Sequence, residues 1–154
     1  MSTAAELDYR RAFDGFEPRV RDLIARYGHH DICDIGGGRT PLLWPKEVAE
    51  LGVDYTLMDV SADELELAPE GHHTLCMDIT APLDPVNHER FDLIFSKFVA
   101  EHVPDGAAMH RNILKMLRPG GHLIIGHAET LNGIPSRLQL VEPSIHRMPG
   151  RDDV

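Results

Sequence analysis

The stretch His30-Asp-Ile-Cys-Asp-Ile-Gly-Gly-Gly-Arg-Thr40 decides how this sequence folds. Its apolar residues Ile32, Cys33 and Ile35 predict a buried strand with one acid near its end. Three consecutive glycines then allow the backbone to turn sharply and to approach a ligand that a Cβ atom would block. We therefore expect a ligand to lie against bare backbone where this first strand ends.

The composition is that of one globular domain. The chain has 154 residues, of which 42% are hydrophobic and 26% are charged, enough to build a core. No apolar run approaches the roughly 18 residues of a membrane helix, and the amino terminus lacks the basic and apolar regions of a signal peptide. We expect a single domain over residues 1–154, located in the cytoplasm, without a membrane partner.

Charge and metal-ligating residues narrow the choice of partners. The net charge of −10 is spread along the chain, and because polyanion binding relies on clustered Lys and Arg, no nucleic-acid partner is expected. His29-His30 and His72-His73 border predicted strands, without a metal-binding helix motif or a Cys-His cluster, which favours surface histidines over a metal site. Cys33 and Cys76 fall in apolar runs and are expected to be buried free thiols.

Strands and helices alternate along the chain, which predicts a doubly wound α/β fold with a mostly parallel sheet. Each apolar strand pattern is bounded by turn residues, and each intervening segment has the spacing of an amphipathic helix. Strands are expected at Asp31–Ile35, Asp54–Asp59, Thr74–Asp78, Phe91–Ser96 and His122–Gly126, and helices at Phe16–Tyr27, Thr40–Leu51, Ser61–Ala68 and Asp105–Leu117.

Chemically suggestive residues follow the predicted strands, at the sheet edge where ligands bind in such folds. Asp59 lies about 20 positions after Gly38, the separation at which a carboxylate accepts hydrogen bonds from both ribose hydroxyls. Asp78 offers an acceptor to an exocyclic amine, and Ile79 offers an apolar surface to a base. Lys97 follows the fourth strand. These positions predict a nucleoside site at the carboxyl ends of the strands.

The glycine turn separates two kinds of nucleotide ligand. The fingerprint of a nicotinamide dinucleotide is Gly-x-Gly-x-x-Gly, but Pro41 stands where its third glycine is required. Asp34 precedes the turn, where it would repel a pyrophosphate but suits a cationic group. A ligand with adenosine at one end and an amino acid at the other fits both facts. Arg39 pairs either with the carboxylate of such a ligand or with solvent.

With these features the chain resembles the class I S-adenosylmethionine-dependent methyltransferases. The resemblance implies a Rossmann-like sheet of five core strands in the order 3-2-1-4-5, S-adenosylmethionine as cofactor, and methyl transfer to a small-molecule acceptor by in-line displacement. Its motifs resemble the segments Asp34–Gly38, Met58–Ser61, Cys76–Ile79, Phe91–Asp105 and Leu117–Ile125. The cofactor-binding residues that it implies are Asp34, Gly36, Gly37, Gly38, Asp59, Val60, Asp78, Ile79 and Lys97.

The chain departs from this family at two places. Arg39-Thr40 stands where the family has a small residue and a glycine. After the fifth strand, residues 127–154 contain three prolines, so strands six and seven should be short or absent, in either a shortened or a natural minimal version of the fold. We expect residues 1–28 to form a helical cap, 30–126 the core, and 127–154 a loosely ordered tail. An exposed fifth strand invites pairing, so we expect cover by this tail or a homodimer.

The catalytic group is the least determined feature. The methyl donor is already activated, so the protein mainly aligns donor and acceptor and excludes water. If the acceptor must lose a proton, His102 and His127 are the first candidates for the base, because a near-neutral pKa suits that role; each is also explained as a surface residue. Two alternatives stay open: a non-catalytic S-adenosylmethionine-binding or interaction domain, and a nicotinamide-dependent oxidoreductase.

Overall fold

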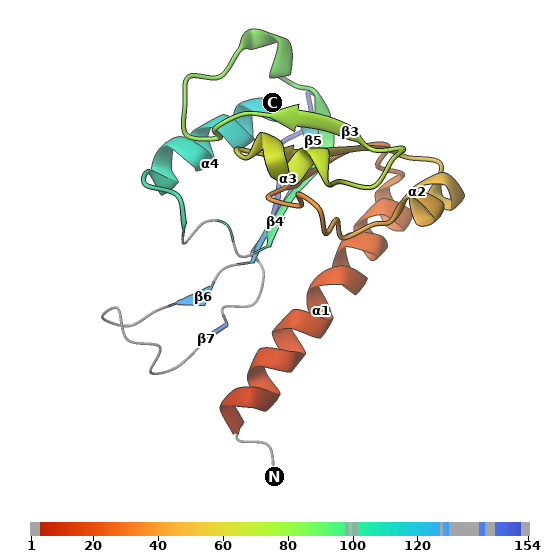
Figure 1. The fold of residues 1–154 in the computed structure, drawn as a ribbon, viewed down its shortest axis with the longest axis vertical. Helices are drawn as coiled ribbons and strands as arrows, with labels where there is room; N and C mark the ends of the chain where they lie inside the picture. Colours follow the sequence, from red (N-terminus) through yellow and green to blue (C-terminus); the bar gives the residue numbers. More distant parts are fainter. Residues whose placement is uncertain are drawn as a thin grey trace.

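A computed structural model describes residues 4–97, 99, 102–126, 128–129, 139–140 and 144–151, with side chains for 15–97, 99, 102–126 and 146–151 (Figure 1). The helices are α1 Ala4–Tyr27, α2 Pro45–Leu51, α3 Ala62–Glu66 and α4 Gly106–Met116, with a 3-10 helix, η1, at Pro85–Asn87. The strands are β1 Asp31–Ile35, β2 Asp54–Asp59, β3 His73–Cys76, β4 Phe91–Lys97, β5 Leu117–Gly126, β6 Ala128–Glu129, β7 Gln139–Leu140 and β8 Ser144–Arg147.

The main sheet has the order β3-β2-β1-β4-β5-β8. Its first five strands are parallel, as β1 pairs with β2 and β4, β2 with β3, and β4 with β5. The predicted fold class and the core order 3-2-1-4-5 are confirmed. Because all five strands run the same way, their carboxyl ends meet at one edge of the sheet.

Both faces of the sheet are covered by helices, and each face has its own core (Figure 1). Alternating side chains of the strands point to opposite faces. On one face α1, with contributions from α2 and α3, packs against Ile32, Tyr55 and Phe95. On the other face α4 packs against Cys33, Ile35, Met58, Ile94 and Leu123.

The predicted helices are present, with different bounds at two places. Helix α2 begins only at Pro45, where the ring fixes φ for a first helical turn, while residues 40–44 are irregular. Helix α1 is one continuous helix from Ala4 that includes Pro18. Ser61 caps α3 as predicted, accepting a hydrogen bond from the Glu64 backbone N at 3.3 Å.

Two expectations about burial and strand bounds are wrong. Cys76 was expected to be buried, but it is exposed on β3, which the predicted order 3-2-1-4-5 places at the sheet edge, whereas Cys33 is buried as predicted. An edge strand has a neighbour on one side only, and the short α3 covers little of it. The strand expected at His122–Gly126 begins earlier, at Leu117, and its pairing with β4 shifts register between Phe91 and Leu93.

The carboxyl-terminal residues continue the main sheet. Strand β8 pairs antiparallel with β5, so that Ile145 lies opposite Ile124. The tail therefore covers the β5 edge, one of the two solutions expected for it, and a dimer through that edge would have to displace β8. Strands β6 and β7 form a separate short pair, and β7 lies near α1. Among the described helices, none has the length and apolarity needed to cross a membrane.

Candidate functional site

A cavity of about 190 Å³ opens at the carboxyl ends of the parallel strands. It is lined by segments from three strand ends and by the chain between β4 and α4. The predicted residues that it brings together are Gly36, Asp59, Val60, Asp78, Ile79 and His102. These residues lie far apart in the chain and, as expected from the sequence, they meet at one place in the fold.

Asp59 is held at the end of β2 by its own local backbone. Its Oδ1 accepts a hydrogen bond from the Ser61 backbone N at 2.9 Å. Its Oδ2 faces the glycine turn, since a Cβ on Gly38 would lie 3.2 Å from that oxygen. Gly38 also has φ +47°, a left-handed conformation that glycine adopts at little cost. The turn and the carboxylate therefore fit closely together at the cavity.

Asp78 and Ile79 follow β3 and give the cavity a polar and an apolar group. Asp78 Oδ1 accepts hydrogen bonds from the Thr80 backbone N at 2.8 Å and from Thr80 Oγ1 at 2.7 Å. These hydrogen bonds lower the pKa of Asp78, so its carboxyl is ionised at neutral pH. Ile79 is buried and offers its side chain as an apolar surface.

The first two glycines of the turn are required by protein neighbours. A Cβ on Gly36 would lie 2.3 Å from Val99 Cγ2, and φ at Gly36 is +76°. A Cβ on Gly37 would lie 2.7 Å from Asp34 Oδ2 and 2.8 Å from Leu57 Cδ2. Gly36 lines the cavity, whereas Gly37 and Gly38 do not. The bare backbone of Gly36 thus lies against Val99 as well as against the cavity.

Asp34 and Lys97, both predicted to bind the cofactor, lie outside the cavity lining. Asp34 is buried, and its Oδ2 accepts hydrogen bonds from Tyr55 Oη at 2.6 Å and from the Leu42 backbone N at 3.1 Å. Burial raises the pKa of Asp34 to about 6. Lys97 Nζ lies 3.8 Å from Glu17 Oε1, beneath α1. The assignment of these two residues to the cofactor stays a prediction.

Arg39, whose partner was left open between ligand and solvent, pairs with a residue of the protein. Its Nε lies 2.8 Å from Glu64 Oε2, and its Nη2 lies 2.6 Å from Glu64 Oε1. This bidentate pair joins the residue after the glycine turn to α3. It occurs where the chain departs from the family pattern.

Of the two candidate bases, only His102 can be described. It is exposed and lines the cavity, and its backbone N donates a hydrogen bond to Val99 O at 2.9 Å. His127 lies outside the described residues. A histidine that lines the cavity is available to an acceptor.

Asn112, which the sequence did not single out, contacts the segment that follows β3. Its Nδ2 donates hydrogen bonds to Ile79 O and to Ala81 O, both at 2.7 Å. The available signal was a polar residue next to Ile113 on the apolar face of α4, which is unusual unless its amide has partners. Those partners lie about 30 residues away and could not be named from the spacing.

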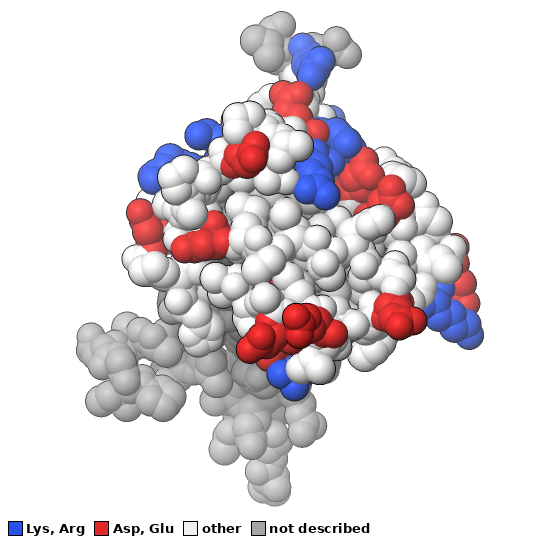
Figure 2. Space-filling view, turned by 45° about the horizontal axis from the view of Figure 1, so that its top comes forward, with Lys and Arg blue, Asp and Glu red and all other residues white. Residues whose placement is uncertain are grey.

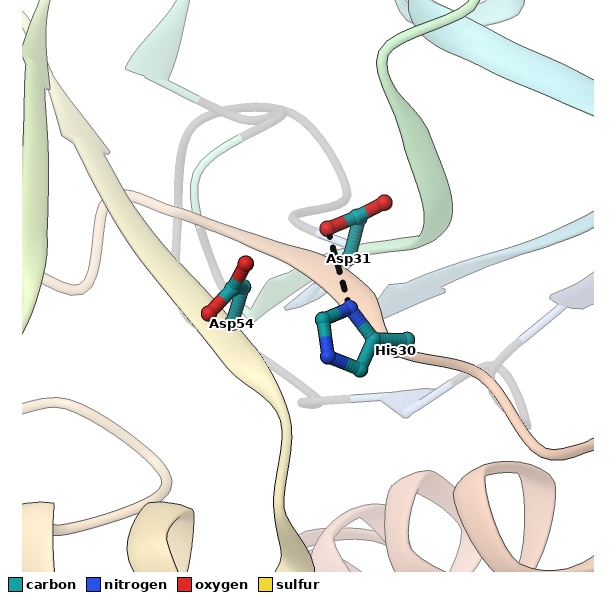
Figure 3. A group of neighbouring side chains, drawn as sticks. All are labelled: His30, Asp31 and Asp54. Atoms are coloured by element: carbon teal, nitrogen blue, oxygen red, sulfur yellow. Dashed lines mark hydrogen bonds and ion pairs between the residues drawn. The ribbon is translucent and has the colours of Figure 1, made fainter.

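A second group of polar side chains lies at the opposite edge of the sheet. His30, Asp31 and Asp54, at the starts of β1 and β2, have ligand atoms within 4.8 Å of one another (Figure 3). His30 Nδ1 lies 3.2 Å from Asp31 Oδ1. The other oxygen of Asp31 accepts a hydrogen bond from Arg118, which also pairs with Asp92. Asp31 is thus paired with Arg118, and the three side chains form a group of the kind that could hold a metal ion, at residues where the sequence predicted none.

Charged side chains are mixed over the face of the molecule in Figure 2, where acidic and basic groups surround an uncharged area. On this face the basic groups of the described residues do not gather into one broad patch. Arg21 of α1 pairs with Glu47 of α2, with a contact of 2.5 Å.

The side chains that line the cavity suit an adenosine ligand. Asp59 and Asp78 are acceptors for hydroxyl and amine groups, and Ile35, Met58 and Ile79 give apolar surface. The two carboxylates lie at the carboxyl ends of neighbouring strands, and ligands of such sheets bind outside these ends.

Comparison with known proteins agrees with this geometry. The family model of the methyltransferase domain matches residues 33–125. Trans-aconitate 2-methyltransferase of Azoarcus sp. (strain BH72) is 31% identical over 134 residues, which are 81% of this chain and 51% of that protein. Ubiquinone biosynthesis O-methyltransferase of Proteus mirabilis is 30% identical over 98 residues, 60% of this chain and 39% of that protein. The chain thus spans only part of the length of these relatives.

Solved structures show the same fold. An S-adenosylmethionine-dependent methyltransferase from Mesorhizobium loti has a TM-score of 0.58 at 26% identity, over 75% of this chain and 55% of that one. The CMeT domain of the citrinin polyketide synthase has a TM-score of 0.65 at 22% identity, over 75% of this chain and 34% of that one. From its residues 33–125, this chain belongs to the methyltransferase-domain family, the class I S-adenosylmethionine-dependent methyltransferases, and its cofactor is S-adenosylmethionine.

Proposed function

We propose that this protein transfers a methyl group from S-adenosylmethionine to a small-molecule acceptor. The observation that carries the proposal is the meeting of Gly36, Asp59, Asp78 and Ile79 at one cavity, from the ends of three successive strands. S-adenosylmethionine supplies a methyl group that is already activated by its sulfonium. The chain has to bind this cofactor, orient it and exclude water.

We assign the ribose hydroxyls to Asp59, whose Oδ1 is fixed by Ser61 and whose Oδ2 faces the glycine turn. We assign the adenine to Val60, Asp78 and Ile79. Thr80 engages one oxygen of Asp78, which fixes the orientation of the carboxylate, and the ionised group is an acceptor for an exocyclic amine. Gly36 gives the amino-acid end of the cofactor a close approach to backbone.

The acceptor is proposed to be a small molecule because curated relatives bear names of that kind, including an aconitate and a ubiquinone-pathway methyltransferase. The mixed surface charge supports this choice, since a polyanionic acceptor favours clustered basic groups. His102, at the mouth of the cavity, is the described candidate for a base when the acceptor must lose a proton.

Calorimetry with S-adenosylmethionine, S-adenosylhomocysteine and NAD tests the cofactor assignment. We expect the two adenosyl ligands to bind and NAD to give no heat. Methyl transfer is then measured with labelled cofactor and a pooled metabolite extract. Binding of NAD alone would refute the proposal.

A second candidate function is a non-catalytic cofactor-binding domain. It is favoured by one observation: apart from His102, the described charged or titratable side chains that line the cavity are Asp59 and Asp78, the two carboxylates assigned to the nucleoside. Cofactor binding without transfer to any component of the extract supports this candidate over an enzyme.

A further inference from the structure

Two of the chain segments that line the cavity are tied to α4. One segment, 77–79, follows β3, and the other, which includes 102–104, leads directly into α4. The first segment is irregular backbone after an exposed edge strand. The Met77 backbone N still donates to Asp59 O at 3.0 Å, which ties the start of the segment to β2. The position of residues 78–79 relative to α4 depends on side-chain contacts, among them the packing of Ile79 in the core cluster that contains α4.

Asn112 provides such a contact. It lies in α4, its side chain is buried, and its Nδ2 donates at 2.7 Å to the carbonyl oxygens of both Ile79 and Ala81. An amide nitrogen has two hydrogens, so the two acceptors use its full donor capacity. One side chain thus fixes the backbone on both sides of Thr80, which in turn holds the Asp78 carboxylate.

We propose that Asn112 is a positioning residue for the adenine end of the cofactor site, because it fixes the segment of Asp78 and Ile79 against α4. This inference rests on the proposed function and adds a residue that does not itself line the cavity. Asn112 acts through the two carbonyl groups and sets where the base-binding groups lie. Its loss should weaken binding of the adenosine end of any ligand, whatever its other end is.

The substitution Asn112→Asp tests this role with almost no change in side-chain volume. The aspartate puts an acceptor in front of two carbonyl oxygens, so both hydrogen bonds are replaced by repulsion in a buried place. We expect dissociation constants for S-adenosylhomocysteine and for 5′-methylthioadenosine, which lacks the amino-acid end, to rise by the same factor of about ten or more. Calorimetry is done at a temperature well below the melting temperature of each variant.

Asn87→Asp is the matched control. Asn87 is also buried, but its Oδ1 accepts a hydrogen bond from Arg90 at 2.8 Å and it does not line the cavity. Aspartate keeps that acceptor, so both affinities should stay at the wild-type value. If Asn112→Asp does not fold, the test uses Asn112→Ala, which removes the donors without adding charge. We expect Asn112→Ala to raise the dissociation constants of both ligands by about threefold or more.

Three outcomes would overturn the inference. Unchanged affinity for both ligands with a lowered melting temperature would show that Asn112 only stabilises the fold. A loss limited to S-adenosylhomocysteine would place its effect at the amino-acid end. Equal loss in Asn87→Asp would show that any buried asparagine in this region has the same effect. If wild-type protein binds neither ligand, the proposed function itself fails, and this result is distinct from the other three.

Discussion

Arg39 and Glu64 form a bidentate ion pair that joins the glycine turn to α3, with the Arg39 Nη2 atom 2.6 Å from Glu64 Oε1. Glu64 also donates its backbone N to the Ser61 side chain, and Ser61 donates its backbone N to Asp59. The residue after the turn is thereby connected, through α3, to the acid assigned to the ribose. Arg39 belongs to the segment Arg39-Thr40, where this sequence departs from the family pattern.

The ion pair should contribute little to overall stability because both side chains are exposed to solvent. We expect Arg39→Ala to change the melting temperature by less than about 3 °C, and the change to be smaller in 1 M salt, where screening weakens exposed ion pairs. Thermal denaturation at low and high salt measures both. A large decrease that persists at high salt would contradict this account.

Asp59→Ala should weaken cofactor binding by at least about tenfold, because two ribose hydroxyls lose their acceptor. Calorimetric titration with S-adenosylhomocysteine measures the effect. Asp63→Ala is the control. Asp63 is an exposed acid in the first turn of α3, close in sequence to Asp59, and it does not line the cavity. Wild-type affinity in Asp59→Ala would refute the role of this residue.

Asp34→Asn should make the protein more stable at pH 8. Burial raises the pKa of Asp34 in the folded protein to about 6, above its ordinary value of about 4. The folded state then binds the proton more tightly than the unfolded state, so wild-type stability falls as the pH rises from about 4 to 6. Asparagine keeps an acceptor for Tyr55 and Leu42 without the charge. We therefore expect the free energy of unfolding of the variant at pH 8 to exceed that of the wild type by about 1–3 kcal/mol.

Urea denaturation of Asp34→Asn and wild type at pH 8 and pH 4 checks this prediction. The difference between them should become small at pH 4, where the wild-type carboxyl is protonated in the folded state and about half protonated in the unfolded state. Lower stability of the variant at pH 8 would mean that the ionised Asp34 is stabilised by its surroundings.

The buried histidine pair should make the protein sensitive to mild acid. His29 Nε2 and His122 Nδ1 lie 2.8 Å apart, and the His122 ring stacks near Tyr27, with centroids 4.3 Å apart. Burial lowers the pKa of His29, and it lowers the pKa of His122 to about 4. The unfolded state therefore binds more protons than the folded state between about pH 6.5 and 4, so stability falls as the pH decreases through this window.

Replacing both histidines, in His29→Phe/His122→Phe, keeps ring packing and removes this titration. We expect the loss of unfolding free energy between pH 7 and pH 4.5 to shrink by roughly 1–2 kcal/mol relative to wild type. The exposed His88 serves as the control, because His88→Gln should keep the wild-type pH dependence. The same slope in the double variant and wild type would exclude the pair as its source.

Local sequence signals predicted most of the fold. The alternation of strands with helices predicted the parallel sheet, and Ser61 predicted the start of α3. These signals succeed because they depend on residues within a few positions of each other. The exposure of Cys76 on β3 was missed, since an apolar strand pattern does not state how far a helix will cover that strand.

The cavity residues Asp59, Asp78 and Ile79 were also predictable, because parallel strands bring their carboxyl ends to one edge. The partner of Arg39 and the two acceptors of Asn112 were not, since each contact joins elements 25 or more positions apart.

The sequence by itself determined that a glycine turn ends the first strand and that acids follow the next two strands at the spacing of a nucleoside site. Only the tertiary structure decided which way each side chain of that strand points. Alternation along β1 puts Ile35 at the cavity and turns Asp34 to the opposite face, where Tyr55 binds it. The choice of face depends on the packing of α1 and α4, which local sequence does not contain.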